Sequence, residues 1–120
     1  MLLRHYEDMN KFQMENMRGG IGTVEVVHLL NPDEMNDKGR LFAENIMPPG
    51  TSIGLHPHYG DTEAYYFLEG TGRYQDNDEF FDMKAGDIAV VDDGDMHGIT
   101  NTGDGQLRFI ALILFTGEKK

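Results

Sequence analysis

Cysteine is absent from the 120-residue chain, and this absence excludes several kinds of site at once. Without cysteine there is no disulfide, no thiolate zinc site and no cysteine nucleophile, so a bound metal has only nitrogen and oxygen ligands. Basic residues are also few, 10 against 21 acidic ones, for a formal net charge of −11 at pH 7. Because nucleic-acid binding needs positive charge, we predict that nucleic acid is not a partner.

Long apolar runs are missing as well. The start of the chain lacks the apolar core of a secretory signal, and no later stretch approaches the length of a membrane span. We therefore predict a cytoplasmic protein with no membrane partner. A chain of 120 residues fits one domain, with a core large enough to fold without disulfides or structural metals.

The chain divides into residues 1–18, interpreted as an N-terminal arm, and residues 19–120, interpreted as a single β domain. The arm mixes aromatic residues and methionines with charges in a rough helical stripe at best. We expect it to pack against the barrel or a partner subunit rather than to take part in an active site.

From Gly19 onward, short β-rich runs alternate with turn residues, which is typical of an all-β barrel or sandwich. The last run is apolar on both faces and favours a strand buried between two layers, with a buried helix as the alternative. The expected strands are 23–29, 40–47, 51–58, 63–68, 72–76, 79–81, 87–91 and 107–115.

Two local patterns are set aside. The glycine-rich stretch 19–22 precedes a strand pattern, whereas a phosphate-binding loop needs the N-terminus of a helix. The acidic residues around Gly94 lack the spacing and the terminal glutamate of an EF-hand, so we interpret them as a solvated turn.

Four residues have the spacing of a metal site. His56 and His58 are separated by one residue in a predicted strand, so both imidazoles leave the same face. Glu63 follows across a short connection, and His97 comes from a distant segment. Three imidazoles and one carboxylate suit iron, zinc, nickel, copper or manganese better than magnesium or calcium, and an octahedral ion would keep two positions open. Outside this pattern, we expect no ligand role for His5 or His28.

The two segments that carry these residues resemble the two conserved motifs of the cupin superfamily. The first is a glycine, five residues, His-Pro-His, four residues, a glutamate, six residues and a glycine, from Gly50 to Gly70; the second runs from Gly86 through His97 to Asn101. One position departs from the family pattern, because Asp92 stands where the family usually has proline.

This resemblance implies a double-stranded β-helix, a jelly-roll-like barrel. It also implies that one divalent transition metal (Fe, Mn, Zn or Ni) is bound by the family's ligands, here His56, His58, Glu63 and His97. Family analogy further suggests a homodimer. If Asp92 is only part of a solvated turn, restoring the family's usual residue by Asp92→Pro is expected to leave the metal content unchanged.

Strand alternation predicts the surroundings of the ion. If Glu63 points inward, Tyr65 and Phe67 share its face, and Tyr65 becomes a candidate catalytic residue whose phenol bonds a substrate oxygen or a metal-bound water. The alternative is that Tyr65 is simply a core aromatic, which is the more common role on a barrel strand. The same alternation places Ser52 and Gly54 beside the two histidines, with Ile53, Leu55 and Pro57 packed behind them. The sequence leaves open whether any basic residue of the barrel points inward, chiefly Arg40, Arg73, Lys84 or Arg108.

Two functions follow from these features. The first is a metal-dependent enzyme that acts on a small oxygen-rich metabolite (a sugar derivative, a hydroxy or keto acid, or a phenolic compound) by direct coordination, as a dioxygenase, isomerase, lyase or decarboxylase. The alternative is a non-catalytic module that binds or senses a small molecule such as a sugar acid through the same ion. The fold does not select the reaction.

Overall fold

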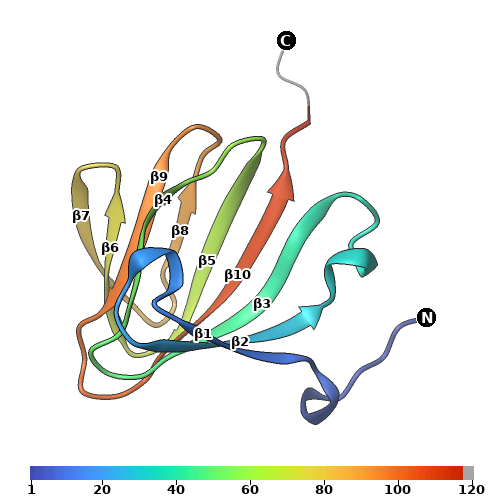
Figure 1. The fold of residues 1–120 in the computed structure, drawn as a ribbon, viewed down its shortest axis with the longest axis horizontal. Coiled ribbons are helices and arrows are strands. Elements are labelled where there is room, and N and C mark those ends of the chain that lie inside the picture. The colour runs from blue at the N-terminus through green and yellow to red at the C-terminus, as the bar shows by residue number, and fades with distance from the viewer. Residues whose placement is uncertain (118–120) are drawn as a thin grey trace.

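A computed structural model, which describes residues 1–117, confirms the all-β prediction (Figure 1). Two antiparallel sheets curve around a common interior, one with six strands in the order β1-β2-β3-β10-β5-β8 and one with four in the order β4-β9-β6-β7. Within these residues no helix is long and apolar enough to cross a membrane. The strands are β1 (Lys11–Glu15), β2 (Thr23–Leu30), β3 (Gly39–Met47), β4 (Ser52–Pro57), β5 (Asp61–Glu69), β6 (Thr71–Asp76), β7 (Glu79–Lys84), β8 (Ile88–Val91), β9 (Met96–Asn101) and β10 (Leu107–Phe115).

The last run of the chain is a strand, as predicted, and it lies near the middle of the larger sheet. β10 pairs with β3 on one side and β5 on the other. Alternate residues such as Phe109 and Ala111 are fully buried in the core, while Ile110 and Leu112 between them are half-buried on the outer face. Burying a large apolar side chain contributes about 1.5–3 kcal/mol, so this strand is a main source of stability.

The first 18 residues do not form a helical stripe. Their main element is β1, which pairs with β2 along its whole length and alternates Phe12 and Met14 with charged or polar neighbours. That period of two is the signal of a strand. Two side-chain contacts fasten the preceding residues to the barrel: the Arg4 guanidinium pairs with Glu34 at 2.6 Å, and the Tyr6 hydroxyl donates to a Glu44 carboxylate oxygen at 2.6 Å. The boundary at residue 18 stays a prediction.

The strand β9 is not among the expected ones, and a glycine explains why it is inconspicuous. β9 lies between β4 and β6, and a Cβ on Gly98 would stand 3.0 Å from the backbone oxygen of Ile53. The close approach of β4 thus favours glycine in the middle of the strand, where propensity alone disfavours it.

The alternation expected along β4 is wrong, because the strand contains a bulge. Ile53 pairs with Ile99 and His56 pairs with His97, so β4 has one more residue than β9 between the two pairs. The extra residue reverses the alternation. Ile53 therefore points into the core beside His56, while Ser52 lies on the other face, where its hydroxyl accepts the backbone N–H of Ile21 at 2.9 Å. Leu55 does not pack behind the histidines and is 39% exposed.

Candidate metal centre

The two sheets bring the four predicted ligands together. His56 on β4 lies directly opposite His97 on β9, His58 follows the end of β4, and Glu63 comes from β5 in the other sheet. All four are buried, and one donor atom from each lies within 4.8 Å of the others. A Glu63 carboxylate oxygen is 3.0 Å from Nε2 of His58 and 2.9 Å from Nε2 of His97. This group can hold a metal ion.

The second nitrogen of each imidazole is occupied by a neighbour that fixes the ring. The Nδ1–H of His56 donates to the Gly54 carbonyl at 2.7 Å, and that of His58 donates to the Asp61 carboxylate at 2.6 Å. Nδ1 of His97 lies 2.8 Å from the hydroxyl of Tyr74. Such contacts orient metal-binding histidines and leave Nε2 as the ligand atom. The donor set therefore fits a transition metal bound through nitrogen and one carboxylate oxygen.

Electrostatics keep His56 and Glu63 in the protonation state that binds a metal. Burial lowers the pKa of His56 to about 4, so the ring is neutral at pH 7. For Glu63, burial alone would raise the pKa, but the hydrogen bonds with His58 and His97 outweigh it and the pKa is lowered. The hydrogen bond with Glu63 raises the pKa of His58, so metal binding there competes with a proton.

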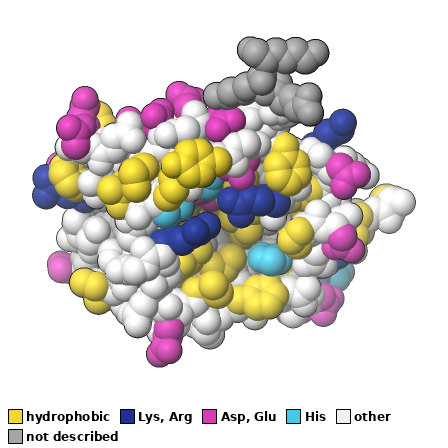
Figure 2. Space-filling model, turned by 45° about the horizontal axis from the view of Figure 1, so that its top comes forward, with side chains coloured by type: hydrophobic (Ala, Val, Ile, Leu, Met, Phe, Trp, Pro, Cys, Tyr) yellow, Lys and Arg dark blue, Asp and Glu magenta, His cyan; other side chains and the backbone are white. Residues whose placement is uncertain are grey.

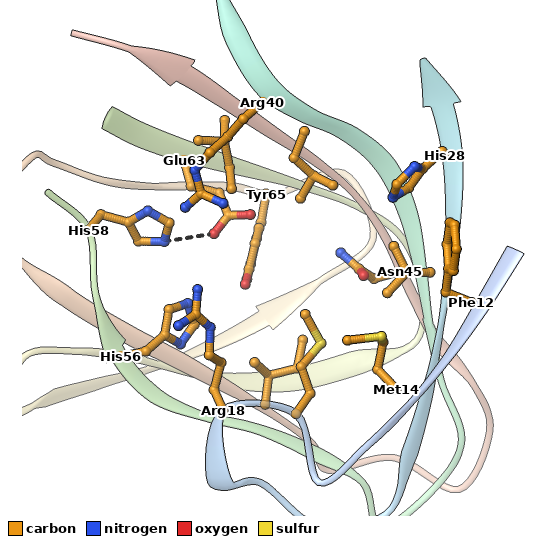
Figure 3. Close-up of a pocket in the computed structure, with 15 residues that line it drawn as sticks. Phe12, Met14, Arg18, His28, Arg40, Asn45, His56, His58, Glu63 and Tyr65 are labelled. Atoms are coloured by element: carbon orange, nitrogen blue, oxygen red, sulfur yellow. Dashed lines mark ion pairs between the residues drawn. The ribbon is translucent and has the colours of Figure 1, made fainter. Parts of the chain in front are cut away.

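A cavity of about 250 Å³ opens beside His56, His58 and Glu63. Figure 2 shows it as a hollow with basic side chains at its edge, histidine within it and hydrophobic side chains around it. Figure 3 shows the side chains that converge on it. Besides the three ligands, the lining consists of Phe12, Met14, Met17, Arg18, Val26, His28, Arg40, Leu41, Asn45, Ile53, Tyr65 and Ile113.

Four of these lining residues, from Phe12 to Arg18, belong to the predicted arm. The expectation that the arm only packs against the barrel is thus too narrow, because β1 and the turn after it form one wall of the cavity. Sequence reasoning missed this role. The alternation of Phe12 and Met14 would have revealed the strand, but the path of that strand across the cavity depends on its pairing with β2.

Two arginines reach the cavity near the metal group. Arg40 donates from Nε to the second oxygen of Asp61 at 2.8 Å and is thereby linked to His58. The side chain of Arg18 makes no hydrogen bond or ion pair with any residue in the described range 1–117, and the φ of 54° at this residue is in the left-handed region that side-chain-bearing residues rarely adopt. A strained residue with an unpaired charge at a cavity mouth points to a role in binding.

The other basic residues that the sequence left open do not line the cavity. Arg73 stacks over the ring of Phe80 at 4.5 Å, and Lys84 pairs with Asp87 on the surface. Arg108 is engaged by carboxylates on the outer face of the larger sheet. The anion-binding capacity of the cavity therefore rests on Arg18 and Arg40.

Tyr65 and Phe67 share the inner face with Glu63, as predicted. Tyr65 is 2% exposed and packs against the rings of His97 and Phe109, with centroids 4.9 and 4.3 Å away. Burial raises the pKa of Tyr65 well above its ordinary value, so the phenol keeps its proton. His28 lines the far wall of the cavity but is not part of the four-residue group.

Comparison with known proteins agrees with this geometry. The family model described as "Cupin domain" matches residues 44–113, which is more than half of the chain. The chain belongs to the cupin family. It is also 48% identical, over 102 residues, to a Thermotoga maritima protein named "Oxalate-binding protein"; the match covers 85% of this chain and 84% of that one.

Solved cupin structures show how far the likeness extends. The crystal structure of a predicted oxalate decarboxylase from Thermotoga maritima superposes with a TM-score of 0.90 and 44% identity, covering 96% of this chain and 99% of that one. A cupin-like protein from the same organism has a TM-score of 0.71 at 21% identity, over 82% and 72% of the two chains, and supports the fold alone.

Proposed function

We propose that this cupin binds a small oxygen-rich acid, such as oxalate or an α-hydroxy or α-keto acid, by direct coordination to one divalent transition metal (Fe, Mn, Zn or Ni). His56, His58, Glu63 and His97 would hold the ion. The observation that carries the proposal is the convergence of this donor group with two arginine side chains at one cavity. A relative named for oxalate binding supports the same ligand class.

Charge favours an anion in the cavity even though the chain is acidic overall. Three neutral imidazoles, one carboxylate and a divalent ion carry a formal charge of about +1. Arg18 adds one positive charge, whereas the charge of Arg40 is balanced by its ion pair with Asp61, so the local sum is about +2. Interactions at contact distance outweigh those from acidic groups more than a Debye length of roughly 8–10 Å away. A dianionic carboxylate is the ligand that best matches this local charge.

The residues around the ion favour a binding function over a catalytic one. A metal in this position would polarise ligand oxygens. Among the cavity-lining residues, however, Glu63 is the one carboxylate and it belongs to the metal group, while Tyr65 holds its proton too firmly to act as a base at neutral pH. The role left for Tyr65 is to donate a hydrogen bond to a bound oxygen.

Catalysis is the second candidate, and the similarity to a predicted oxalate decarboxylase favours it. In that case the same coordinated acid would be the substrate of a decarboxylase, lyase, isomerase or dioxygenase. Incubation of oxalate with metal-loaded protein, followed by assays for carbon dioxide and formate, separates turnover from binding. Tyr65→Phe should then lower the rate by a larger factor than it lowers the affinity for oxalate.

The test of the main proposal combines metal analysis with ligand titration. Protein purified without added metal should carry close to one equivalent of transition metal, and calorimetry should detect oxalate binding to the loaded form. The double variant His56→Ala/His58→Ala should lose both, whereas His5→Ala, outside the four-residue group, should lose neither. Full metal occupancy in the double variant, or equal oxalate binding by metal-free protein, would refute the proposal.

We also propose that the chain forms a homodimer through the outer face of the six-stranded sheet. Tyr66 pairs with Ile88 there, and Val90 lies two residues further along the strand of Ile88. The three are 47%, 62% and 51% exposed and form an apolar surface that a second copy could cover. Light scattering should report a dimer for the unchanged protein and a monomer for Ile88→Lys. Glu79→Lys, on the other sheet, is the control and should stay dimeric.

A further inference from the structure

The side chain of Asn45 is buried in the cavity wall without a hydrogen-bond partner. Asn45 lies on the inner face of β3, between Val26 of β2 and Phe109 of β10, and is 2% exposed. Its Oδ1 is the one fully buried side-chain nitrogen or oxygen in residues 1–117 that lacks a partner. Buried polar groups in native proteins are almost always paired, so an unpaired one needs an explanation.

A second buried asparagine shows what a structural role looks like in this fold. The amide of Asn101 donates to the carbonyl oxygens of Met47 and Gly105, each at 2.9 Å, and its Oδ1 accepts the backbone N–H of Gly103 at 2.9 Å. Asn101 thus ties a loop to β3. Asn45 makes none of these contacts, and its polar group supports no neighbouring element.

Asn45 instead faces the cavity, far from the metal group. In Figure 3 its amide points into the cavity from the side opposite His56 and His58. Glu63 pairs with Ile113, which pairs with Leu41, and Asn45 is four residues further along β3. At about 3.3 Å per residue and 4.8 Å between strands, the Cα atoms of Glu63 and Asn45 are separated by about 13 Å along the sheet and about 10 Å across it. The two backbones are thus well separated, and a cavity of about 250 Å³ has room for a ligand longer than a two-carbon ion.

The cavity between the two ends is apolar. Met14, Met17 and Val26 are among the apolar residues that line the cavity. Both arginines lie at the metal end in Figure 3. A carbon chain fits that middle section, and an amide at the far end offers one donor and one acceptor, which a hydroxyl group matches. Among residues 1–117, no arginine or lysine lies beside Asn45, and His28 is the other polar side chain on the far wall, so we assign a hydroxyl or carbonyl oxygen to the far end of the ligand.

We infer that Asn45 recognises the distal end of the ligand, and that the cognate ligand is an acid longer than oxalate, with a metal-chelating head, a short apolar chain and a terminal hydroxyl or carbonyl oxygen. This inference rests on the proposed function, because the same metal binds the head of the acid. According to this inference, Asn45 determines which acid binds more tightly among those that coordinate the metal equally well.

The test compares two keto acids that differ only at the far end. Calorimetric titration of metal-loaded protein with δ-hydroxy-α-ketovalerate should give an affinity about fivefold higher than with α-ketovalerate, the effect of one net hydrogen bond. Asn45→Leu should abolish that preference and leave oxalate affinity within about twofold of the unchanged protein. No preference in the unchanged protein, or a preference that survives in Asn45→Leu, overturns the inference. Failure of oxalate itself to bind would instead refute the proposed function.

Metal-free protein supplies a readout that is independent of the ion. Replacing an unpaired buried amide by an apolar side chain of similar volume should not lower the thermal midpoint. Asn101→Ala should lower it, yet keep the preference for the hydroxy acid when loaded with metal. A midpoint that falls as far in Asn45→Leu as in Asn101→Ala would show that Asn45 supports the fold and would overturn the inference. If Asn45→Leu fails to fold, Asn45→Ala is titrated with the same pair of acids.

Discussion

Asp61 should control metal affinity although it is not in the ligand group. It is 4% exposed, and its two oxygens accept hydrogen bonds from different donors, Nδ1 of His58 at 2.6 Å and Nε of Arg40 at 2.8 Å. Asp61→Asn keeps the shape of the side chain but replaces one acceptor by a donor. Because both neighbours are donors, one contact is lost and an N–H then faces an N–H.

The expected cost is a 10–100-fold loss of metal affinity, the usual effect of removing a carboxylate that orients a metal-binding histidine. This loss equals about 1.4–2.7 kcal/mol of binding free energy. At saturating metal the same amount is lost from the stability of the loaded protein, which lowers its thermal midpoint by roughly 5–10 °C for a domain of this size.

Competition with a chelator of known affinity measures the metal dissociation constant, and calorimetry measures the midpoint. Work at about pH 8 limits proton competition at His58, whose pKa is raised chiefly by the hydrogen bond with Glu63. Asp87→Asn, in a surface turn beside Lys84, is the matched control and should leave the metal affinity unchanged. An affinity within threefold of the unchanged protein in Asp61→Asn would show that Asp61 does not orient His58.

Three further predictions follow from other residues. Arg18→Gly should weaken oxalate binding without lowering stability, because glycine adopts the left-handed φ of 54° without strain; equal oxalate affinity in calorimetry would remove Arg18 from the site. Asp92→Pro should leave the metal content unchanged by elemental analysis and stabilise the fold by about 0.4–1 kcal/mol in urea titrations, and a loss of metal would contradict the interpretation of this turn as solvated. The hydrogen bond to Glu44 raises the pKa of Tyr6 from 10.0 to about 12, so its contribution to stability is complete below pH 10 and is lost as the pH rises through 12. Tyr6→Phe should make the alkaline loss of stability shallower, and an unchanged pH profile would show that this pair does not contribute.

The parts of the site that sequence could predict are those set by local chain geometry. His56, His58 and Glu63 lie within one strand, one turn and the start of the next strand, so strand periodicity and spacing were enough to group them. Tyr65 was placed on the correct face for the same reason. In contrast, the extra residue that forms the bulge in β4 has no recognisable sequence signal. It places Ile53, and not Gly54, on the same face of the strand as His56.

The parts that sequence could not place depend on pairing between distant segments. Arg18 reaches the cavity because β1 pairs with β2 and the following turn then crosses the opening. The inward direction of Arg40 follows from an irregular register where β3 pairs with β10. Asn45 could have been predicted from the sequence. Strand alternation from Ala43 to Met47 places this polar residue on an otherwise apolar face. A buried polar residue of this kind often indicates a functional role.

Metal binding and ligand choice rest on different parts of this fold. The ion would be held by residues of β4, β5 and β9 and the adjoining turn, where paired strands and buried hydrogen bonds fix each donor within a few ångströms of the others. Arg18 and much of the apolar wall come instead from residues 12–18, most of which belong to the edge strand β1. This segment is held in place by its pairing with β2 and by contacts of the preceding residues, such as the hydrogen bond of Tyr6 with Glu44. A change in this N-terminal segment can therefore alter which acid is bound while the donor group stays intact. A change among the donor residues of β4, β5 and β9 alters both.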